Sequence, residues 1–361
     1  MRVLFAALGV GLCVVAWWLY QPAQAQELRV DVALEPRPKL ISRPVAAAAE
    51  TNSPSVAPIG SIPLTPPALP PQKAALRLPP GAHTTLLVGI DRRPDAKGAG
   101  LADTILVAIL DETQQMAGVV SIPRDLWVTI PDYGENRINV IPMVARAQKK
   151  PLLELFSRVI EDTLGLPVTH GIFVDLGVFE RVVDAVGGVD VAVPCPIIDS
   201  FHDTRVPGGR RRLDLTEGQA LLDGPTAAMY VRSRHGRSDF GRARRQQAVL
   251  LGLRDRMLSL GGFVRVPELY SAVEESISTD LRRYELVDLA RRVLALDRDK
   301  LHGLVLSPPL TRAHATDDGK AVLLPDRDAI TEAILALPKA GPPGEPLKVP
   351  CPPADAALRG R

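Results

Sequence analysis

Arginine is concentrated in one stretch of this chain, residues 229–247. Six arginines and a histidine lie between Arg232 and Arg245, and Gly236 and Gly241 interrupt them. The guanidinium group is a rigid fork of hydrogen-bond donors that matches the oxygens of a phosphate, and glycine lets the backbone come close to a ligand. The stretch therefore predicts an anion-binding loop suited to phosphate.

The residues of this stretch alone are also compatible with two different structures. Clustered arginine occurs on solvated helix starts and on nucleic-acid-binding surfaces. The whole chain has 43 Lys plus Arg against 41 Asp plus Glu, a formal net charge of +2, and this near balance argues against a nucleic-acid binder. After Asp239 the pattern becomes helical, which places Arg242 and Gln246 on one helix face.

Three apolar runs rich in β-branched residues predict consecutive buried strands, at Thr84–Ile90, Thr104–Leu110 and Met116–Ile122. Asp91 directly follows the first run, Asp103 directly precedes the second, and Arg124 follows the third after a proline. If the second strand runs antiparallel to its neighbours, these three side chains gather at one edge of the sheet. Such edges are where α/β proteins place ligands.

Asp91 and Asp103 supply two carboxylates at this edge. Mg²⁺ in proteins takes one or two carboxylates together with phosphate oxygens and waters, so the pair predicts a Mg²⁺ site, with Mn²⁺ as the alternative ion. Either residue alone would also fit a structural role, as the cap of a turn or of a strand start. The arginines on the neighbouring loops favour the metal–phosphate interpretation.

The remaining pattern alternates between strands and helices. Further strands are predicted at Gly171–Asp175, Val189–Val193 and Leu304–Leu306. Helices are predicted at Leu152–Leu164, Phe179–Val186, Phe240–Leu260, Pro267–Ile277, Leu281–Leu296 and Asp326–Leu337, with two short helical pieces between Leu213 and Arg234. Strands interleaved with helices predict an α/β domain at residues 81–338, a three-layer α/β/α sandwich with a mixed central sheet.

The two ends of the chain have a different composition. Residues 1–21 are almost wholly apolar and predict a transmembrane anchor, with a cleaved secretory signal as the alternative because Ala23-Gln-Ala25 resembles a cleavage site. Both place the remainder outside the cytoplasm, and the anchor predicts a single-pass protein of the cytoplasmic membrane. The Pro/Ala-rich residues 22–80 predict a disordered, extended linker, and the Pro-rich residues 339–361 predict a mobile tail.

The three cysteines, Cys13, Cys195 and Cys351, lie far apart in the sequence. Their spacing matches no metal-binding pattern and no disulfide framework. We expect Cys195 and Cys351 to be unpaired, and a bridge between them is the alternative.

An ordered set of short motifs between about Leu86 and Leu251 resembles the LytR–CpsA–Psr family. Besides the arginine stretch, the set comprises Gly89-Ile-Asp91, Ala102-Asp-Thr104, Ser121-Ile-Pro-Arg124-Asp125, Ile138-Asn139, Val174-Asp175, Val186-Gly-Gly-Val189 and Leu222-Asp-Gly224. No single motif is decisive, but the order of the whole set is specific. A membrane anchor, a spacer and one exported α/β domain is also the usual layout of that family.

The resemblance implies a phosphotransferase that moves a glycan phosphate from a polyprenyl diphosphate carrier onto a cell-envelope acceptor, peptidoglycan or another glycan. Asp91 and Asp103 would then hold Mg²⁺, and Asp125 and Asp239 would orient arginines or act as the general base. The residues implied to bind the diphosphate are Arg93, Arg124, Arg232, Arg234, Arg242 and Gln246. The residues implied to take part in catalysis are Arg124, Asp125, Arg232, Arg234 and Asp239.

The sequence departs from the family pattern in two places. Leu101 stands where many members have arginine, so one phosphate contact is missing or is supplied by Arg92, next to the preferred ligand Arg93. Residues 210–220 look like an extra segment, which bears on the choice of acceptor. Diphosphate hydrolysis by the same residues, and a membrane-anchored regulator or binding protein of envelope biogenesis, are the alternative functions. Apolar faces within residues 172–189 and 250–290 are candidates for contact with the lipid, and ordinary core packing is the alternative for each residue there.

Overall fold

The structure is a computed structural model that describes residues 76–91, 100–233, 239–261, 277–345 and Cys351. Its contacts divide the chain into two units, residues 1–66 and 67–361. The first unit, with the predicted anchor and most of the predicted linker, lies outside the described residues, as does nearly all of the helix predicted at Pro267–Ile277. Among the helices that are described, none combines the length and the apolar character needed to cross a bilayer.

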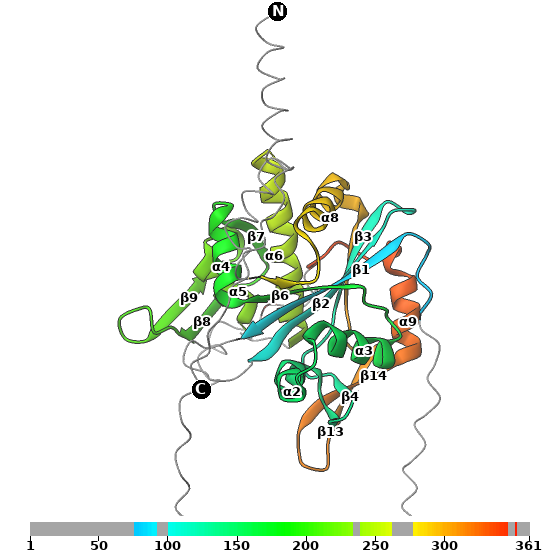
Figure 1. Ribbon diagram of the computed structural model, residues 1–361. Helices are drawn as coiled ribbons and strands as arrows, with labels where there is room; N and C mark the ends of the chain where they lie inside the picture. Colours follow the sequence, from blue (N-terminus) through cyan, green and yellow to red (C-terminus); the bar gives the residue numbers. More distant parts are fainter. Residues whose placement is uncertain (1–75, 92–99, 234–238, 262–276, 346–350, 352–361) are drawn as a thin grey trace, which may run out of the picture. The chain divides into compact units, whose positions relative to one another are not determined.

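A six-stranded sheet with the strand order β11-β6-β1-β2-β3-β12 forms the centre of the second unit (Figure 1). Its strands are β1 (Ala82–Asp91), β2 (Leu101–Asp111), β3 (Met116–Ser121), β6 (His170–Asp175), β11 (Ser278–Thr279) and β12 (Leu301–Val305). β2 runs antiparallel to β1 and β3, which is the condition for Asp91, Asp103 and Arg124 to share one edge, whereas β1 with β6 and β3 with β12 are parallel pairs. The predicted α/β class and mixed sheet are confirmed.

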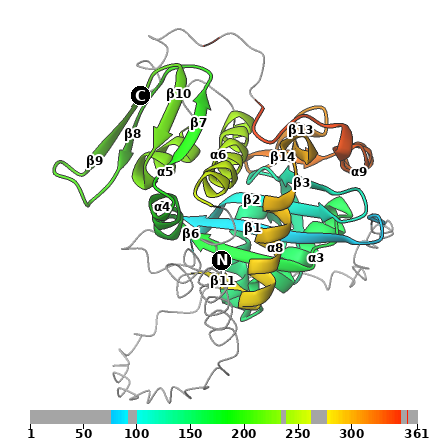
Figure 2. The same cartoon turned by 90° about the horizontal axis from the view of Figure 1, so that it is seen from above.

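Helices cover both faces of this sheet (Figures 1 and 2). They are α2 (Ile141–Gln148), α3 (Leu152–Leu164), α4 (Leu176–Ala185), α5 (Gly224–Arg232), α6 (Asp239–Ser259), α8 (Arg283–Ala295) and α9 (Arg327–Leu335), with 3₁₀ turns at Ile138–Val140, Arg298–Lys300 and Leu337–Lys339. α2 and α3 lie on one face, and α6 and α8 lie on the other. α3 has the predicted bounds because Phe156 and Ile160 are fully buried on its inner side and Gly165 ends it at φ 74°.

Four short strands pack beside the sheet with α4, α5 and α6. β7 (Val189–Val193) pairs with β10 (Gly218–Leu222), and β8 (Ile197–His202) pairs with β9 (Arg210–Leu215), both antiparallel. They enclose a second apolar cluster, which includes Val189, Tyr230 and Val249. Two further hairpins that we did not predict are β4 (Trp127–Ile130) with β5 (Gly134–Arg137) and β13 (Thr311–Ala315) with β14 (Ala321–Pro325).

Part of the prediction for residues 213–234 is wrong. Only α5 is helical there, and the residues before it form β9 and β10. Leu213 is 1% exposed while its neighbours Arg212 and Asp214 are exposed, and this alternation is that of a strand with one buried face. The Asp223 side chain accepts a hydrogen bond from the Thr226 backbone N–H at 2.9 Å and so starts α5.

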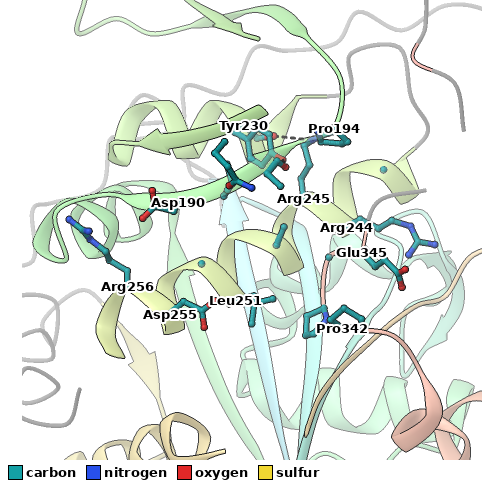
Figure 3. Close-up of a pocket in the computed structure, with 18 of the residues that line it drawn as sticks. Asp190, Pro194, Tyr230, Arg244, Arg245, Leu251, Asp255, Arg256, Pro342 and Glu345 are labelled. Atoms are coloured by element: carbon teal, nitrogen blue, oxygen red, sulfur yellow. Dashed lines mark hydrogen bonds between the residues drawn. The ribbon is translucent and has the colours of Figure 1, made fainter. Parts of the chain in front are cut away.

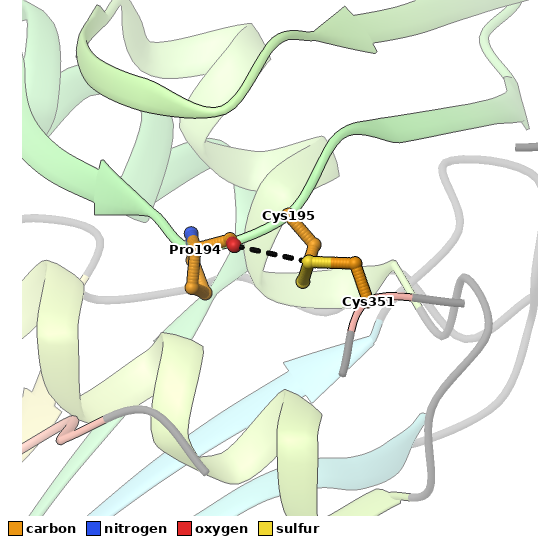
Figure 4. The surroundings of a disulfide bond; sticks show 3 residues. All are labelled: Pro194, Cys195 and Cys351. Carbon is orange, nitrogen blue, oxygen red and sulfur yellow. Dashed lines mark hydrogen bonds between the residues drawn. A yellow bond between two sulfur atoms is a disulfide. The ribbon is translucent and has the colours of Figure 1, made fainter. Parts of the chain in front are cut away.

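Cys195 and Cys351, which we expected to be unpaired, form a disulfide (Figure 4). The two residues are 156 positions apart in sequence, and their Cα atoms are 5.6 Å apart. The chain before Cys351 returns along α6, where the Gly344 N–H donates to Gln247 Oε1 at 3.1 Å and a Cβ on Gly344 would lie 2.6 Å from that of Ala248. The first residues of the predicted mobile tail, 339–345, are therefore held against the domain.

Candidate active site

A β-bulge shapes the end of the β1–β2 pair. The register is regular up to the pairing of Gly89 with Thr104 and shifts before Ile90, which leaves Asp103 as the extra residue. A bulge breaks the strict alternation of side chains and re-aims one of them. Asp103 and Thr104, although consecutive, therefore both line the same cavity as Asp91.

The cavity at this end of the sheet has a volume of about 420 Å³. Six of the predicted site residues line it: Asp91, Asp103, Arg124, Arg232, Arg242 and Gln246. They come from β1, β2, the segment after β3, α5 and α6, so the fold brings together positions that are far apart in sequence. Asp125 and Asp239 lie beside Arg124, whereas Arg93 and Arg234 belong to segments that the structure does not describe.

Arg124 lies at the centre of the charges in this cavity. Its Nη1 donates to Asp103 Oδ1 at 2.6 Å, and its Nε lies 3.7 Å from Asp125 Oδ2 and 3.9 Å from Asp239 Oδ2. Burial acts to lower the pKa of this guanidinium, but the hydrogen bond to Asp103 and the nearby carboxylates raise the pKa above its ordinary value. Arg124 Nε is buried with no hydrogen-bond partner in the described part of the chain, and an oxyanion would satisfy such a donor.

Asp125 and Asp239 form a carboxyl pair beside Arg124. Burial and then a hydrogen bond with Asp239 raise the pKa of Asp125 above its usual range, against the opposing effect of Arg124 and Arg137. Arg137 Nε lies 3.4 Å from Asp125 Oδ1, and Arg242 Nη1 lies 3.4 Å from Asp239 Oδ1. The pair can thus orient three arginines and also exchange a proton, which is what a general base requires.

α5 and α6 contribute the other polar groups of the cavity. α5 ends at Arg232, whose Nη2 lies 4.0 Å from Asp91 Oδ2. On α6, Arg242 is buried, which lowers the pKa of its guanidinium. Gln246 Nε2 donates to Thr104 Oγ1 at 2.8 Å. Because Arg242 and Gln246 both line the cavity, their predicted position on one face of a helix is confirmed.

The carboxylate oxygens of Asp91 and Asp103 are of the type that Mg²⁺ prefers as ligands. The two side chains are 27% and 31% exposed and face one cavity, so oxygens of a ligand and waters can reach them. No group of three or more His, Cys, Asp or Glu residues that could hold a metal occurs among the described residues. A seat of two carboxylates binds Mg²⁺ well only when a phosphate completes the coordination, and the arginines here are suited to that same phosphate.

Apart from Asp175, most of the remaining wall of the cavity is apolar. It is formed by β6, α4 and α6, through Ile172, Val174, Leu176, Val178, Phe179, Val182, Leu250 and Leu253. A charged end that continues into an apolar wall suits an amphiphilic ligand. These residues fall within the two segments, 172–189 and 250–290, that we named as candidates for contact with a lipid.

A second cavity, of about 540 Å³, lies on the opposite side of α6 (Figure 3). None of the predicted site residues that the structure describes lines it. Its Arg245 has a structural role, since Nε donates to the Tyr230 carbonyl oxygen at 3.2 Å and the guanidinium lies 5.8 Å from the centre of the Tyr230 ring. Size alone would favour this cavity, but the carboxylates and arginines suited to phosphate chemistry are gathered in the smaller one.

Reasoning from the sequence missed Arg137, Asp199 and Phe201 as site residues. Arg137 contacts Asp125, and it directly precedes the Ile138-Asn139 motif, which was a usable signal. The Phe201 ring lies 5.3 Å from the Arg232 guanidinium, and Asp199 accepts a hydrogen bond from Ser233. Nothing in the local sequence marks Asp199 or Phe201, because only the fold brings β8 next to the end of α5.

Comparison with known proteins gives the same assignment. The model of the LytR_cpsA_psr family matches residues 71–334. The polyisoprenyl-teichoic acid–peptidoglycan teichoic acid transferase TagU of Enterococcus faecalis is 27% identical over 252 residues, 69% of this chain and 76% of its own. TagV of Bacillus subtilis, a transferase of the same description, is 28% identical over 55% of this chain and 49% of its own. The cell wall biosynthesis protein LcpA of Corynebacterium glutamicum is 29% identical over 68% and 54%, so the matched region spans about half of these last two.

Solved structures share the fold. The crystal structure of B. subtilis TagV matches with a TM-score of 0.57 at 24% identity, covering 72% of this chain and 98% of that one. A structure of TagT bound to LIIa-WTA matches with a TM-score of 0.56 at 23% identity, covering 72% and 91%. With the family match extending over most of the chain, the protein belongs to the LytR_cpsA_psr family.

Proposed function

We propose that this protein is a Mg²⁺-dependent phosphotransferase that moves a glycan phosphate from a polyprenyl diphosphate carrier onto a cell-envelope acceptor. The observation that carries the proposal is the convergence of two carboxylates, three arginines and an apolar wall on one cavity. Family membership supports it, because the relatives from E. faecalis and B. subtilis are named as transferases of polyisoprenyl-linked teichoic acid to peptidoglycan.

The diphosphate of the donor is proposed to bind among Arg124, Arg232 and Arg242. Their forked donors can each bind two phosphate oxygens, and the partial burial of Arg124 and Arg242 strengthens the attraction. Asp91 and Asp103 are the residues that would hold Mg²⁺, which when bound neutralises charge on the phosphates. The set of diphosphate ligands is proposed to be completed by Arg93, Arg234 and Gln246.

The reaction proposed is an attack by an acceptor hydroxyl on the phosphorus that carries the glycan. A P–O bond forms to the acceptor oxygen, the P–O bond to the bridging oxygen breaks, and polyprenyl phosphate leaves. The hydroxyl proton passes to the Asp125–Asp239 pair, which lies beside Arg124. Alignment and charge neutralisation supply most of the catalysis in phosphoryl transfer, and the arginines of this chain are placed to provide both.

The lipid tail of the donor is proposed to lie along the apolar wall formed by β6, α4 and α6. Each buried CH₂ group of an isoprenoid contributes about 0.8 kcal/mol, so even a few units would anchor the carrier. The cavity thus combines charged groups with an apolar wall, which matches a molecule with a diphosphate at one end and a hydrocarbon chain at the other.

The domain is proposed to act outside the cytoplasmic membrane, anchored through residues 1–21, with no nucleic acid as a partner. The disulfide between Cys195 and Cys351 supports export, because such bonds persist in oxidising compartments. The near balance of charges supports the exclusion of nucleic acid. The envelope acceptor, peptidoglycan or another glycan, is reached only from this side of the membrane.

The deciding experiment incubates the full-length protein in detergent with a polyprenyl diphosphate glycan, Mg²⁺ and peptidoglycan. The expected products are glycan phosphate attached to peptidoglycan and free polyprenyl monophosphate. Arg124→Ala should lower kcat/KM by about 10²–10³-fold, the usual loss when a charge-stabilising group is removed. The matched control is Arg158→Ala, because Arg158 lies on α3 with its side chain 56% exposed in a surface ion pair.

Each outcome of that assay has a distinct meaning. Free glycan phosphate without attachment to the acceptor would identify a diphosphate hydrolase instead of a transferase. Wild-type activity in Arg124→Ala would show that this cavity is not the site of the reaction. Equal losses in Arg124→Ala and Arg158→Ala would indicate a general effect on folding, which thermal unfolding of both variants detects.

A further inference from the structure

The β8–β9 hairpin is attached to α4 at its tip by a group of ion pairs. Arg205 donates to Glu180 through Nη1 at 2.5 Å and through Nη2 at 3.0 Å, and its Nε donates to Asp203 Oδ1 at 2.9 Å. Arg211 Nε donates to the other oxygen of Asp203 at 3.1 Å. Glu180 is itself buried on α4, so the guanidinium of Arg205 links this helix to Asp203 in the turn of the hairpin. The hairpin is thus fixed to the helix whose apolar residues form the cavity wall.

The base of the same hairpin holds the end of α5. Asp199 Oδ2 accepts a hydrogen bond from Ser233 Oγ at 2.7 Å, and Ser233 is fully buried. The carbonyl oxygen of Ser233 also accepts from Arg245 Nη2 on α6. Ser233 directly follows Arg232, so β8 and α6 together fix the backbone that carries this arginine.

The direction of the Arg232 side chain is set by Phe201 more than by its carboxylate neighbour. Arg232 Nη2 lies 4.0 Å from Asp91 Oδ2, which is beyond a charge-assisted hydrogen bond. The guanidinium instead lies 5.3 Å from the centre of the Phe201 ring, in the range of a cation–π contact. Phe201 and Arg232 both line the cavity, so the ring supports the guanidinium from the side of the hairpin.

We infer that the β8–β9 hairpin sets the position of Arg232, with Asp199 and Phe201 as the positioning residues. The inference rests on the proposed function, in which Arg232 binds the donor diphosphate. Asp199 acts on the backbone through Ser233, and Phe201 acts on the guanidinium. Residues 210–220, which look like an extra segment in the sequence, include β9, the strand that pairs with β8 along its whole length. The unusual segment is therefore part of the support of an active-site arginine.

The test compares Asp199→Ala with Asp199→Asn in the full-length protein. Alanine removes the acceptor of the Ser233 hydroxyl, whereas asparagine keeps an oxygen in the same place. Asp199→Ala should lower kcat about tenfold and also raise KM for the lipid donor about tenfold, since a misplaced Arg232 loses contact with the diphosphate in the bound donor and in the transition state. Asp199→Asn should restore kcat to within about threefold of wild type. Phe201→Leu, which keeps an apolar side chain, should also lower kcat.

A double-mutant comparison separates positioning from a general structural effect. In an Arg232→Lys background the loss caused by Asp199→Ala should largely disappear, because the group being positioned has already changed. Arg212→Ala is the matched control, since Arg212 lies on β9 with its side chain 66% exposed and away from the cavity. Unchanged kcat in Asp199→Ala and Phe201→Leu, or equal losses in both backgrounds, would overturn the inference.

A binding measurement keeps this inference apart from the proposed reaction. Calorimetric titration with inorganic pyrophosphate and Mg²⁺ reports on the arginines without any transfer. Asp199→Ala should weaken pyrophosphate binding about tenfold and Asp199→Asn should restore it. If wild-type protein binds pyrophosphate with this dependence on Asp199 but transfers no glycan, the proposed reaction fails and the positioning role stands. If pyrophosphate binding is the same in wild type and Asp199→Ala, the positioning role fails.

Discussion

Asp125 has a raised pKa because of its burial and its hydrogen bond with Asp239. A carboxyl whose pKa is higher in the folded state than its ordinary value of 3.8 favours folding at low pH, where it is protonated in the native protein. This contribution is lost as the pH rises through the raised pKa. The asparagine of the Asp125→Asn variant cannot ionise. We therefore expect the free energy of unfolding to fall less in this variant than in wild type as the pH rises from about 4 to about 7.

Urea denaturation across this pH range measures the difference between Asp125→Asn and wild type. Asp132 provides a control of opposite sign, because its hydrogen bond and ion pair with Lys150 lower its pKa. The stability that ionised Asp132 contributes is therefore present above pH 3.8 and is lost as the pH falls through the lowered pKa. Parallel pH profiles for wild type and Asp125→Asn would show that Asp125 ionises as freely in the folded protein as in the unfolded chain.

Single residues of the site could be predicted where their type and setting both pointed to phosphate chemistry. Asp91, Asp103 and Arg124 lie at predicted strand ends, and all three line the cavity. The bulge that turns Asp103 toward the cavity could not be predicted, because it depends on the register between two strands. Asp199 and Phe201 were not predicted, because their importance arises from contacts with the end of α5 and not from their own sequence neighbourhood.

The helix α6 carries two consecutive glutamines whose side chains lie in different surroundings. Gln247 is buried, with Nε2 donating to Ser121 Oγ at 2.8 Å and Oε1 accepting from the Gly344 N–H. Gln246 lines the cavity. We expect Gln247→Leu to lower the unfolding free energy by about 2–4 kcal/mol, because it leaves buried groups of β3 and the carboxy-terminal segment without partners.

Gln246→Leu is the natural companion, since it changes the same side chain at the adjacent position. Its loss of stability should stay within about 1 kcal/mol because Gln246 is only partly buried, while its kcat/KM should fall about tenfold with the loss of a cavity donor. Thermal unfolding and the transfer assay, applied to both variants, give the comparison. A larger loss of stability in Gln246→Leu than in Gln247→Leu would reverse these assignments.

Elements with strong local signals were predicted closely, and those without them were not. α3 has an apolar stripe that ends at Gly165, and β7 is an apolar run closed by Pro194, so both bounds follow from the sequence. α4 begins three residues before the predicted Phe179, because the Asp175 side chain accepts from the Val178 N–H and caps the helix there. The residues from Leu213 to Leu222, where we predicted a short helical piece, form the end of β9 and all of β10, because they pair with β8 and β7.

For the molecule as a whole, the disulfide is a covalent link between two segments that are far apart in sequence. Cys195 and Cys351 are 156 residues apart, and on a chain-entropy argument a bridge over so long a loop stabilises the folded state by about 3–5 kcal/mol. We expect the Cys195→Ser/Cys351→Ser double variant to unfold at a correspondingly lower denaturant concentration. Reduction of wild type should reproduce the loss, and reduction of the variant should change nothing. Equal unfolding midpoints for the two oxidised proteins would contradict this.

The fold class could be predicted from the sequence, but the contacts between segments far apart in the chain could not. Strands interleaved with helices follow from local pattern, whereas the antiparallel direction of the second strand was a condition of the predicted site and not itself predicted. The bridge between Cys195 and Cys351, and the return of residues 339–345 along α6, depend on where distant segments meet in space. The secondary-structure propensities of single segments do not predict which distant segments come into contact.

The parallel pairing of β3 with β12 has a consequence for the order of folding. Ser121 pairs with Val305, so the strand that leads into Arg124 acquires its outer neighbour only from a segment made long afterwards. Every predicted site residue precedes β12, and a chain stopped before it would contain them all while leaving β3 as an open edge available to foreign strands. Contacts this remote also slow folding, so a newly made polypeptide already contains every predicted site residue before the sheet that positions them is complete.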